Sequence, residues 1–301
     1  MSVRSGELPG VEAVRKLGWL SAHRWLIARR FSQAVILLLF MAGPWFGVWL
    51  IEGNLSSSRV LDTLPLTDPY LLLQSLFAGH MPEQSALVGA LIVIAFYLLL
   101  SGRVYCSWVC PLNAVTDFAY WLRGRLGLKG GAHIPSATRY WMIGATLLVS
   151  LLTGALTFEL VNPVSMLHRG LIFGLGTAWV FVLGVFLFDL FGAKRGWCGR
   201  LCPVGAFYSL IGRFSLLRIR SDGRSKCDDC MDCYEVCPEP RVIKPALKDT
   251  QAEPVVTSSL CTLCGRCMDV CPEKVFHLGS RLSSIVANPP AQPTGLEVMK
   301  K

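Results

Sequence analysis

Four long apolar runs divide the chain, near residues 31–51, 86–101, 141–160 and 171–192. Each run is about 16 to 22 residues long, close to the length that an α-helix needs to cross a hydrocarbon core of roughly 30 Å. A helix suits lipid because it satisfies its own backbone hydrogen bonds. The pattern therefore predicts an α-helical membrane protein with four transmembrane helices.

Basic residues are distributed unevenly around these runs. Residues 52–85 contain Arg59 alone among lysines and arginines, and the short loop before the fourth run holds only Arg169. The segment before the first run is much more basic and carries Arg4, Arg15, Lys16, Arg24, Arg29 and Arg30. Because positively charged flanks stay in the cytoplasm, we expect a multi-pass protein with both termini on the cytoplasmic side.

Two short segments permit other interpretations. Arg29 and Arg30 before Phe31 resemble a twin-arginine export signal, but three more apolar runs follow, so a retained membrane anchor explains more of the sequence. In the first outer loop, Asp68 and Pro69 precede a short apolar stretch, a pattern typical of a helix start. We expect an interfacial helix there, either a simple lid or one wall of a quinone pocket.

Composition agrees with contact with lipid. The 301 residues are 52% hydrophobic and only 16% charged, with a mean hydropathy of +0.48, which is more apolar than a soluble globular protein. A net charge of +9 would fit nucleic-acid binding in a soluble protein. Here the basic residues flank apolar runs and orient them, so we expect no nucleic-acid partner.

The C-terminal part contains the motif C-x-x-C-x-x-C-x-x-x-C-P twice. This spacing is typical of bacterial two-cluster ferredoxins, in which the fourth cysteine of each motif binds the other cluster. Zinc explains C-x-x-C pairs, but it takes four ligands and rarely accounts for a doubled eight-cysteine pattern ending in C-P. We therefore expect two [4Fe-4S] clusters. The predicted ligands of one are Cys227, Cys230, Cys233 and Cys271, and those of the other are Cys261, Cys264, Cys267 and Cys237.

These motifs predict a small ferredoxin-like α+β domain on the cytoplasmic side. A domain of this size has little apolar core, so bound clusters should supply much of its folding free energy. The motifs contain no nucleophile, general base or phosphate loop, which favours an electron carrier. The expected organisation is an N-terminal segment, a membrane domain, the ferredoxin-like domain and a tail, at residues 1–30, 31–218, 219–280 and 281–301.

Two further cysteine pairs follow the second and fourth apolar runs. "RVYCSWVCP" contains Cys106 and Cys110, and 92 residues later "RGWCGRLCP" contains Cys198 and Cys202. This repetition predicts two similar halves in the membrane domain. Cysteines four apart share one face of an α-helix, and the proline after each pair ends one helix and starts the next. The amphipathic segments that follow should turn their aromatic residues inward and their arginines outward.

Three roles are open for these four thiols. Disulfides are disfavoured because cytosolic reductants keep thiols reduced. The cysteines are either buried structural thiols, or they converge on a further iron–sulfur cluster or act as a redox relay. Nearby, Asp189 lies in the fourth run, where a carboxylate marks a proton or quinone path or pairs with Arg103 or Arg195. Weaker candidates near the outer face are His80, Glu159, His168 and Arg169.

Taken together, the motifs resemble the NapH family, the ferredoxin-type membrane subunits of periplasmic nitrate reductase systems. The resemblance runs from about Gly18 to His277, and no cysteine departs from the family pattern. The stretches that carry it are "GPWFGVW", "DTLPLTDP", "CSWVCPLNAVTD", "NPVS", "GWCGRLCPVGAFY", "CMDCYEVCPEP" and "CGRCMDVCPE".

The resemblance implies a quinol dehydrogenase component of anaerobic respiration in the bacterial inner membrane. Electrons from membrane quinol would pass, with a periplasmic ferredoxin-like partner and c-type cytochromes, toward periplasmic nitrate reductase. The chain would act as a subunit, and nitrate would not bind it. The resemblance offers no quinone-site motif, so no catalytic residue is assigned.

An alternative function belongs to another class. Related polyferredoxins with C-x-x-x-C-P pairs supply electrons for the assembly or maintenance of metalloenzymes. A purely structural anchor for a partner is a third interpretation, but it leaves twelve cysteines unexplained. The dehydrogenase interpretation has its own difficulty, because the expected clusters lie on the cytoplasmic side and the implied acceptor lies outside, about 30 Å of hydrocarbon away.

Overall fold

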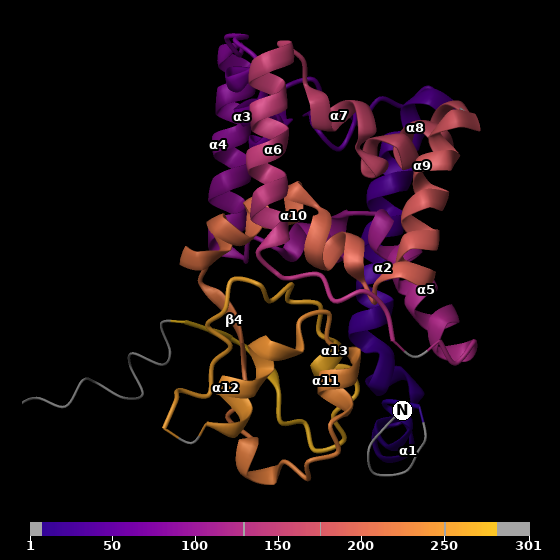
Figure 1. Ribbon diagram of the computed structural model, residues 1–301, viewed down its shortest axis with the longest axis vertical. Coiled ribbons are helices and arrows are strands. Elements are labelled where there is room, and N and C mark those ends of the chain that lie inside the picture. Colours follow the sequence, from indigo (N-terminus) through magenta and orange to yellow (C-terminus); the bar gives the residue numbers. More distant parts are fainter. Residues whose placement is uncertain (1–7, 129, 175, 250, 282–301) are drawn as a thin grey trace, which may run out of the picture.

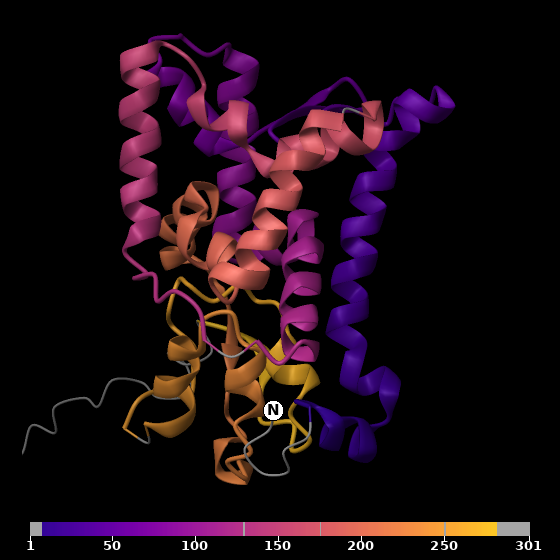
Figure 2. The same cartoon turned by 45° about the vertical axis from the view of Figure 1, so that its right-hand side comes forward.

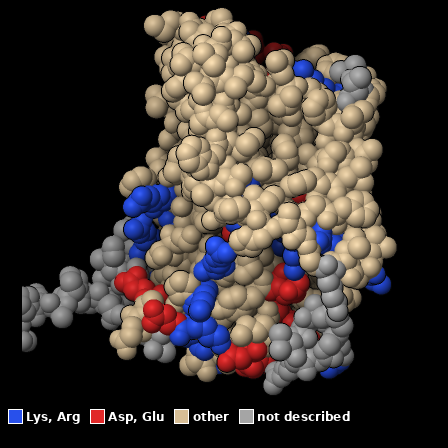
Figure 3. Space-filling model, viewed as in Figure 1, with Lys and Arg blue, Asp and Glu red and all other residues tan. Residues whose placement is uncertain are grey.

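The structure is a computed structural model that describes residues 8–128, 130–174, 176–249 and 251–281. Two helical bundles stand side by side on a small α+β domain (Figure 1). Charged side chains gather mainly on the lower part of the face shown in Figure 3. Most of the predicted tail, from residue 282 on, and residues 1–7 of the predicted N-terminal segment lie outside the described residues.

A helix occupies each of the four apolar runs. The helices are α2 (Trp19–Phe46), α4 (Gln84–Leu99), α6 (Thr138–Thr153) and α9 (Gly176–Leu187), and a π-helical turn (Phe188–Gly192) extends the last. Within the described residues, α2 alone has the length and composition to cross a membrane, while Gln84–Leu99 and Ala178–Gly192 are apolar but shorter. The four helices are therefore confirmed, but four membrane-crossing lengths are not.

Glycines close helices inside three of the four apolar runs. Gly47, Gly154 and Gly174 have φ angles of 73°, 64° and 66°, and the N–H of each bonds back to the last turn of its helix. Glycine adopts this left-handed conformation without steric cost and so closes a helix. The predicted boundaries were wrong for this reason, because the run 31–51 ends in a strand, 141–160 contains a break, and 171–192 begins within the preceding helix.

Two short helices begin with the same kind of cap. In α3 (Pro69–Phe77), the Asp68 side chain accepts a hydrogen bond from the backbone N–H of Tyr70. In α8 (Pro163–Phe173), Asn162 accepts one from Val164. The helix predicted after Asp68 is confirmed. The second was missed, although Asn162 before a proline is the same signal.

The two halves of the sequence interleave in space. Helices α3, α4 and α6 pack with α10 (Pro203–Ile211), while α2, α8 and α9 form the other bundle with α5 (Leu112–Arg125). Both views show this grouping (Figures 1 and 2). Each bundle therefore contains helices from both halves. At the end opposite the α+β domain lie an antiparallel sheet of β1 (Ile51–Gly53), β2 (Ser57–Val60) and β3 (Leu64–Thr67), and the short helix α7 (Thr157–Val161).

Helix α5 does not face the way its composition predicts. Arg123 is 5% exposed, whereas Phe118 and Trp121 are 54% and 52% exposed. The Arg123 guanidinium donates to the carbonyl oxygen of Leu190 at 2.7 Å, in the π-helical turn after α9, where carbonyl groups lack partners within the helix. The predicted orientation, with aromatic residues inward and arginines outward, was therefore wrong at these residues of α5, whereas in the second segment Tyr208 is buried and Arg213 is exposed.

The α+β domain is closed by pairing of its first and last strands. β4 (Leu217–Arg220) lies antiparallel to β5 (His277–Ser280), and a small buried core packs beneath them. Helix α1 (Val11–Leu17) lies against this domain, because the backbone N–H of Gly10 donates to Asp232 at 3.0 Å. The remaining helices are α11 (Asp232–Val236), α12 (Ile243–Lys248) and α13 (Arg266–Asp269), with 3-10 turns at Gly212–Phe214, Arg224–Lys226 and Pro240–Val242.

Candidate iron–sulfur sites

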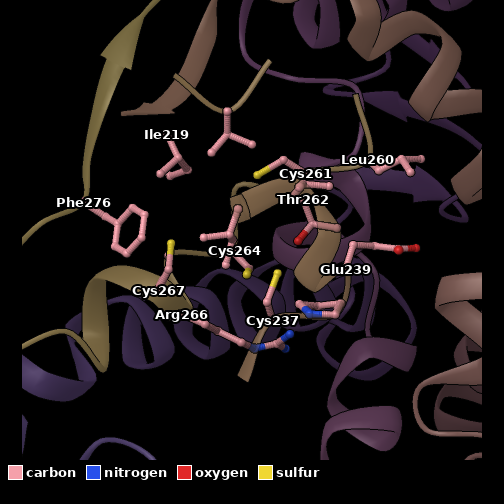
Figure 4. Close-up of a pocket in the computed structure, with 15 residues that line it drawn as sticks. Ile219, Cys237, Glu239, Leu260, Cys261, Thr262, Cys264, Arg266, Cys267 and Phe276 are labelled. Carbon is pink, nitrogen blue, oxygen red and sulfur yellow. The ribbon is translucent and has the colours of Figure 1, made fainter. Parts of the chain in front are cut away.

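Four cysteines line one pocket of the α+β domain. Their thiols point into the same space (Figure 4). The rest of the lining is mainly apolar and includes Ile219 and Phe276. We call this pocket the proximal site, because its loops contact the helical bundles. Its cysteines are Cys237, Cys261, Cys264 and Cys267.

The other four cysteines of the domain line a second pocket, the distal site. Phe276 borders both pockets and so lies between them. Each site combines three cysteines of one motif with the fourth of the other, as the spacing predicts. That these thiols bind clusters stays a prediction. The distal cysteines are Cys227, Cys230, Cys233 and Cys271.

The electrostatic environment of the thiols shows the same grouping. Burial, and then the charges of Cys230, Cys271 and Cys227, raise the pKa of Cys233 to about 12. No three His, Cys, Asp or Glu side chains of the described ranges lie close enough to share a single metal ion. The thiolates of a [4Fe-4S] cluster need not do so, because the cluster has four irons and each thiolate binds its own.

The two ferredoxin motifs turn their backbones in the same way. Met231 and Gly265 occupy equivalent positions, and both have left-handed φ angles, 63° and 73°, directly before α11 and α13. A Cβ atom on Gly265 would lie 2.5 Å from the Trp25 ring of α2. Glycine is therefore required where the second motif approaches the helical bundles.

Each C-x-x-x-C-P pair lies on a π-helical turn. These turns span Tyr105–Val109 and Trp197–Leu201. Cys110 N donates to the carbonyl five residues back at 2.9 Å, and Cys202 N does the same at 2.9 Å. The expected shared face of an α-helix was therefore wrong, because the turn is wider than an α-helical turn. Such turns occur often at functional sites. As predicted, a helix follows each proline.

The two pairs converge at the base of the bundles. The backbone N–H of Gly205 donates to Cys202 Sγ at 3.5 Å, and a Cβ atom on Gly205 would lie 3.5 Å from Cys106 Sγ. Burial, followed by the charges of Cys110, Asp189, Cys202 and Cys106, raises the pKa of the Cys198 thiol. We call the group formed by Cys106, Cys110, Cys198 and Cys202 the four-thiol site.

Arg103 connects the four-thiol site to the proximal site. Its side chain is 1% exposed. Nη1 donates to the Leu260 carbonyl at 2.8 Å, and Nη2 donates to the Cys198 carbonyl at 3.1 Å. Of the two suggested partners of Asp189, Arg103 or Arg195, only Arg195 acts on it, through its charge, and the hydrogen bond that Asp189 accepts comes from the backbone N–H of Trp197 at 2.9 Å. Asp189 thereby holds the start of the second π-helical turn.

Two neighbours of Arg103 hold the same cluster loop. Ser107 Oγ donates to the Thr262 carbonyl at 2.7 Å, and Trp108 Nε1 donates to the Leu263 carbonyl at 3.1 Å. The loop that carries the second ferredoxin motif is therefore fixed directly to the first C-x-x-x-C-P turn.

Asp117 of α5 is the second link between the domains. It accepts hydrogen bonds from Arg266, the shorter at 2.5 Å, and from Arg30, with Arg29 and Arg195 3.8 Å away. Burial alone would raise the pKa of Asp117, but the charges of these arginines lower it to about 2. The sequence gives no sign of this role, because the contact with Arg266 joins residues 149 positions apart.

The donor sets fit iron–sulfur clusters. Each site offers four buried or half-buried thiols, and thiolate-bound clusters are anionic. Within the described residues, Arg103 Nε and Arg29 Nη1 are buried without hydrogen-bond partners, beside the four-thiol site and the proximal site respectively. Buried cations of this kind suit a negatively charged group.

The weaker polar candidates do not form one site. His80 Nε2 lies 3.0 Å from the Gly154 carbonyl, and His168 is buried edge-on against Phe40. Glu159 accepts hydrogen bonds from Ser56, Ser165 and Asn162, which tie the β1–β2 turn to the start of α8.

Comparisons with known proteins agree with these sites. Residues 83–129 and 173–221, which contain both C-x-x-x-C-P pairs, match a 4Fe-4S binding domain, and residues 226–275 match a 4Fe-4S dicluster domain. The chain is 49% identical over 275 residues to the ferredoxin-type protein NapH of Escherichia coli (strain K12), covering 91% of this chain and 96% of that protein. This chain belongs to the NapH family of ferredoxin-type proteins. No solved structure matches it significantly.

The NapH family extends beyond proteins of that name. The chain is 53% identical over 270 residues to the methylamine utilization ferredoxin-type protein MauN of Paracoccus denitrificans (strain Pd 1222), covering 90% of this chain and 95% of that protein. It is 49% identical over 273 residues to NapH of Haemophilus influenzae, with 90% and 95% coverage. The resemblance predicted from the motifs is confirmed, and this chain is a ferredoxin-type electron-transport protein.

Proposed function

We propose that this chain is a membrane electron-transfer subunit, a quinol dehydrogenase component. It takes electrons from quinol and passes them through iron–sulfur clusters to a periplasmic ferredoxin-like partner, and on through c-type cytochromes toward periplasmic nitrate reductase. The observation that carries this proposal is the arrangement of three cysteine sites in series, with Arg103 bonded to both the four-thiol and the proximal site.

Cysteines of the chain would determine where the iron–sulfur clusters lie, and other side chains fix the spacing between the cluster sites. A bound iron–sulfur cluster supplies one-electron transfer. The eight ferredoxin cysteines would hold two clusters, and Cys106, Cys110, Cys198 and Cys202 would hold a further one. Arg103, Ser107 and Trp108 keep the four-thiol site and the proximal site at a fixed separation. The apolar helices would carry this arrangement in a multi-pass bacterial inner-membrane protein with cytoplasmic termini.

The proposed route outward is supported by elements from the opposite end of the bundles. Leu55, in the turn between β1 and β2, packs against the apolar cluster that contains Cys110 and Val164. An aromatic cluster that includes Tyr70 and Tyr208 packs against Cys202. Segments expected on the outer side thus share packed clusters with two cysteines of the four-thiol site, which supports a route through the bundles.

The decisive test replaces Cys106 and Cys202 by alanine. Quinol-dependent electron delivery should stop, while the EPR signals of both ferredoxin clusters stay. Met81→Ala is the matched control, because that side chain is 92% exposed. Undiminished delivery in the cysteine variant contradicts the proposed role. A chain without its eight ferredoxin cysteines should still bind iron and acid-labile sulfide, and an iron-free, folded protein argues against a separate four-thiol cluster.

A second candidate function is an accessory polyferredoxin that supplies electrons for the assembly or maintenance of a metalloenzyme. The similarity to MauN favours this alternative, because relatives of nearly equal identity are named for a different metabolic system. Steady quinol oxidation by membranes that contain the chain and its partner supports the dehydrogenase. A defect confined to cofactor maturation supports the accessory role.

A further inference from the structure

Buried arginines surround the proximal site. Arg266 lies between Cys264 and Cys267 in the sequence and is 8% exposed. Arg29 is 1% exposed and lies 3.8 Å from Asp117, the carboxylate to which Arg266 donates at 2.5 Å. Arg103 adds a third charge through its bond to the Leu260 carbonyl, next to Cys261.

A fourth arginine reaches the remaining cysteine of this site. Arg195 Nη1 donates to the Val236 carbonyl, next to Cys237, at 2.6 Å. The nearby carboxylates do not cancel these charges. Asp117 is one negative charge shared among Arg266, Arg195, Arg30 and Arg29. Asp269 adds one more near Arg29, and Glu239, which lines the pocket, already pairs with Arg139 and Arg200. The proximal site therefore has a surplus of positive charge.

Carboxylates surround the distal site instead. Asp228 accepts a hydrogen bond from the Cys230 backbone N–H at 3.3 Å, and Asp232 directly precedes Cys233. Lys248 lies near this site and forms an ion pair with Asp229, and Lys226 directly precedes Cys227. Among the described residues, the distal site therefore has no surplus of positive charge like that of the proximal site.

Reduction adds one electron to a cluster, so nearby positive charge stabilises the reduced state and nearby negative charge destabilises it. We propose that the two ferredoxin clusters have unequal reduction potentials, with the proximal cluster the higher. Water at the more exposed distal site acts in the opposite direction, but buried full charges are screened less than exposed ones and outweigh it.

This inequality gives the pair a direction. If the pair of clusters held one electron, that electron would move from the distal to the proximal cluster, so that the distal cluster would lose one electron and the proximal cluster would gain it. Electrons are then held beside the four-thiol site, from which the proposed route to the partner leaves, and are not released at the distal surface. The inference rests on the proposed function for its ligand assignments. It adds a preferred direction of electron transfer between the two clusters, which the ligand assignments alone do not give.

The test is an anaerobic EPR titration of the purified full chain, reduced stepwise with dithionite. Arg266→Gln should lower the higher midpoint and leave the lower one in place, and Asp228→Asn should raise the lower one. Arg29→Gln, outside the cluster loops, repeats the first shift if the Arg266 variant loses its cluster. Arg59→Gln is the matched control, because its side chain is 57% exposed in the outer loop, and it should move neither midpoint.

Cys230→Ala assigns each EPR signal to its site, because loss of a distal ligand should remove the signal with the lower midpoint. Equal midpoints, loss of the higher signal in Cys230→Ala, or a shift of the wrong signal in the arginine variants would overturn the inference and leave the proposed function standing. A chain that binds no cluster at either ferredoxin site would overturn the proposed function itself. The two failures are therefore distinguishable.

Discussion

Replacing Asp117 by alanine is expected to loosen the contact between the ferredoxin-like domain and the helical bundles. Its carboxylate is the acceptor for Arg266 at 2.5 Å, and its side chain is 16% exposed. The pKa of Asp117 falls from 3.8 to about 2. A shift of that size corresponds to about 2 kcal/mol of interaction with the ionised group. Since 1.4 kcal/mol is a factor of ten, local opening should increase about 30-fold.

Hydrogen exchange measures this opening directly, because amides exchange in proportion to the open population. Residues 260–270 should exchange about 30-fold faster in Asp117→Ala than in the unchanged protein. Asp62→Ala is the control, since Asp62 pairs with Arg59 at 3.7 Å with its side chain 77% exposed, and such pairs contribute about 0 to 1 kcal/mol. Equal exchange in the two variants would refute the importance of the buried carboxylate.

The same carboxylate makes the contact sensitive to acid. The pKa of Asp117 is depressed in the folded protein, so its contribution is fully present above the unfolded value of 3.8 and is lost as the pH falls through about 2. The unchanged protein should therefore lose protection at residues 260–270 over this range. Asp117→Ala should lack this component of the pH dependence.

Three further predictions follow from local contacts. Anaerobic removal of iron with a chelator should abolish the circular dichroism of the ferredoxin-like domain, because bound clusters stabilise so small a domain. Most of the signal from the helical bundles should remain, and an unchanged spectrum would contradict the prediction. Trp108→Phe removes the donor to Leu263 and should cost about 1 kcal/mol, raising exchange near Leu263 about fivefold, whereas Trp141→Phe, at a side chain 78% exposed, should have no effect. Asn162→Ala should destabilise α8 by about 1 kcal/mol through loss of its cap, and exchange confined to other helices would contradict this.

Features that depend on neighbouring residues could be predicted from the sequence. The crossed grouping of the ferredoxin cysteines follows from their spacing, and the cap at Asp68 follows from its place before a proline. Helix ends were less predictable, because Gly47 and Gly154 close helices inside apolar runs. Hydropathy carries no information about the backbone conformation that these glycines adopt. A spacing of four between Cys106 and Cys110 is compatible with both an α- and a π-helical turn.

Contacts between distant segments could not be predicted. Asp117 meets Arg266 only because α5 passes the second ferredoxin motif, and no local pattern in either segment indicates the other. The inward direction of Arg123 has the same origin, since the carbonyl groups that it bonds belong to the turn after α9. Arg123 was expected at the surface, and Asp117 received no role, because pairing that permits burial of a charge is a property of the tertiary fold.

The interleaving of the halves explains why four cysteines converge. The first C-x-x-x-C-P pair connects α4 of one bundle to α5 of the other, and the second connects α9 of that other bundle back to α10 of the first. Both segments cross between the same two bundles at the same end, and there they lie close together. The cysteines lie on the crossing segments, so duplication of the motif places two pairs at one point. A single half supplies only one pair of cysteines. The four-thiol site therefore requires both copies of the motif.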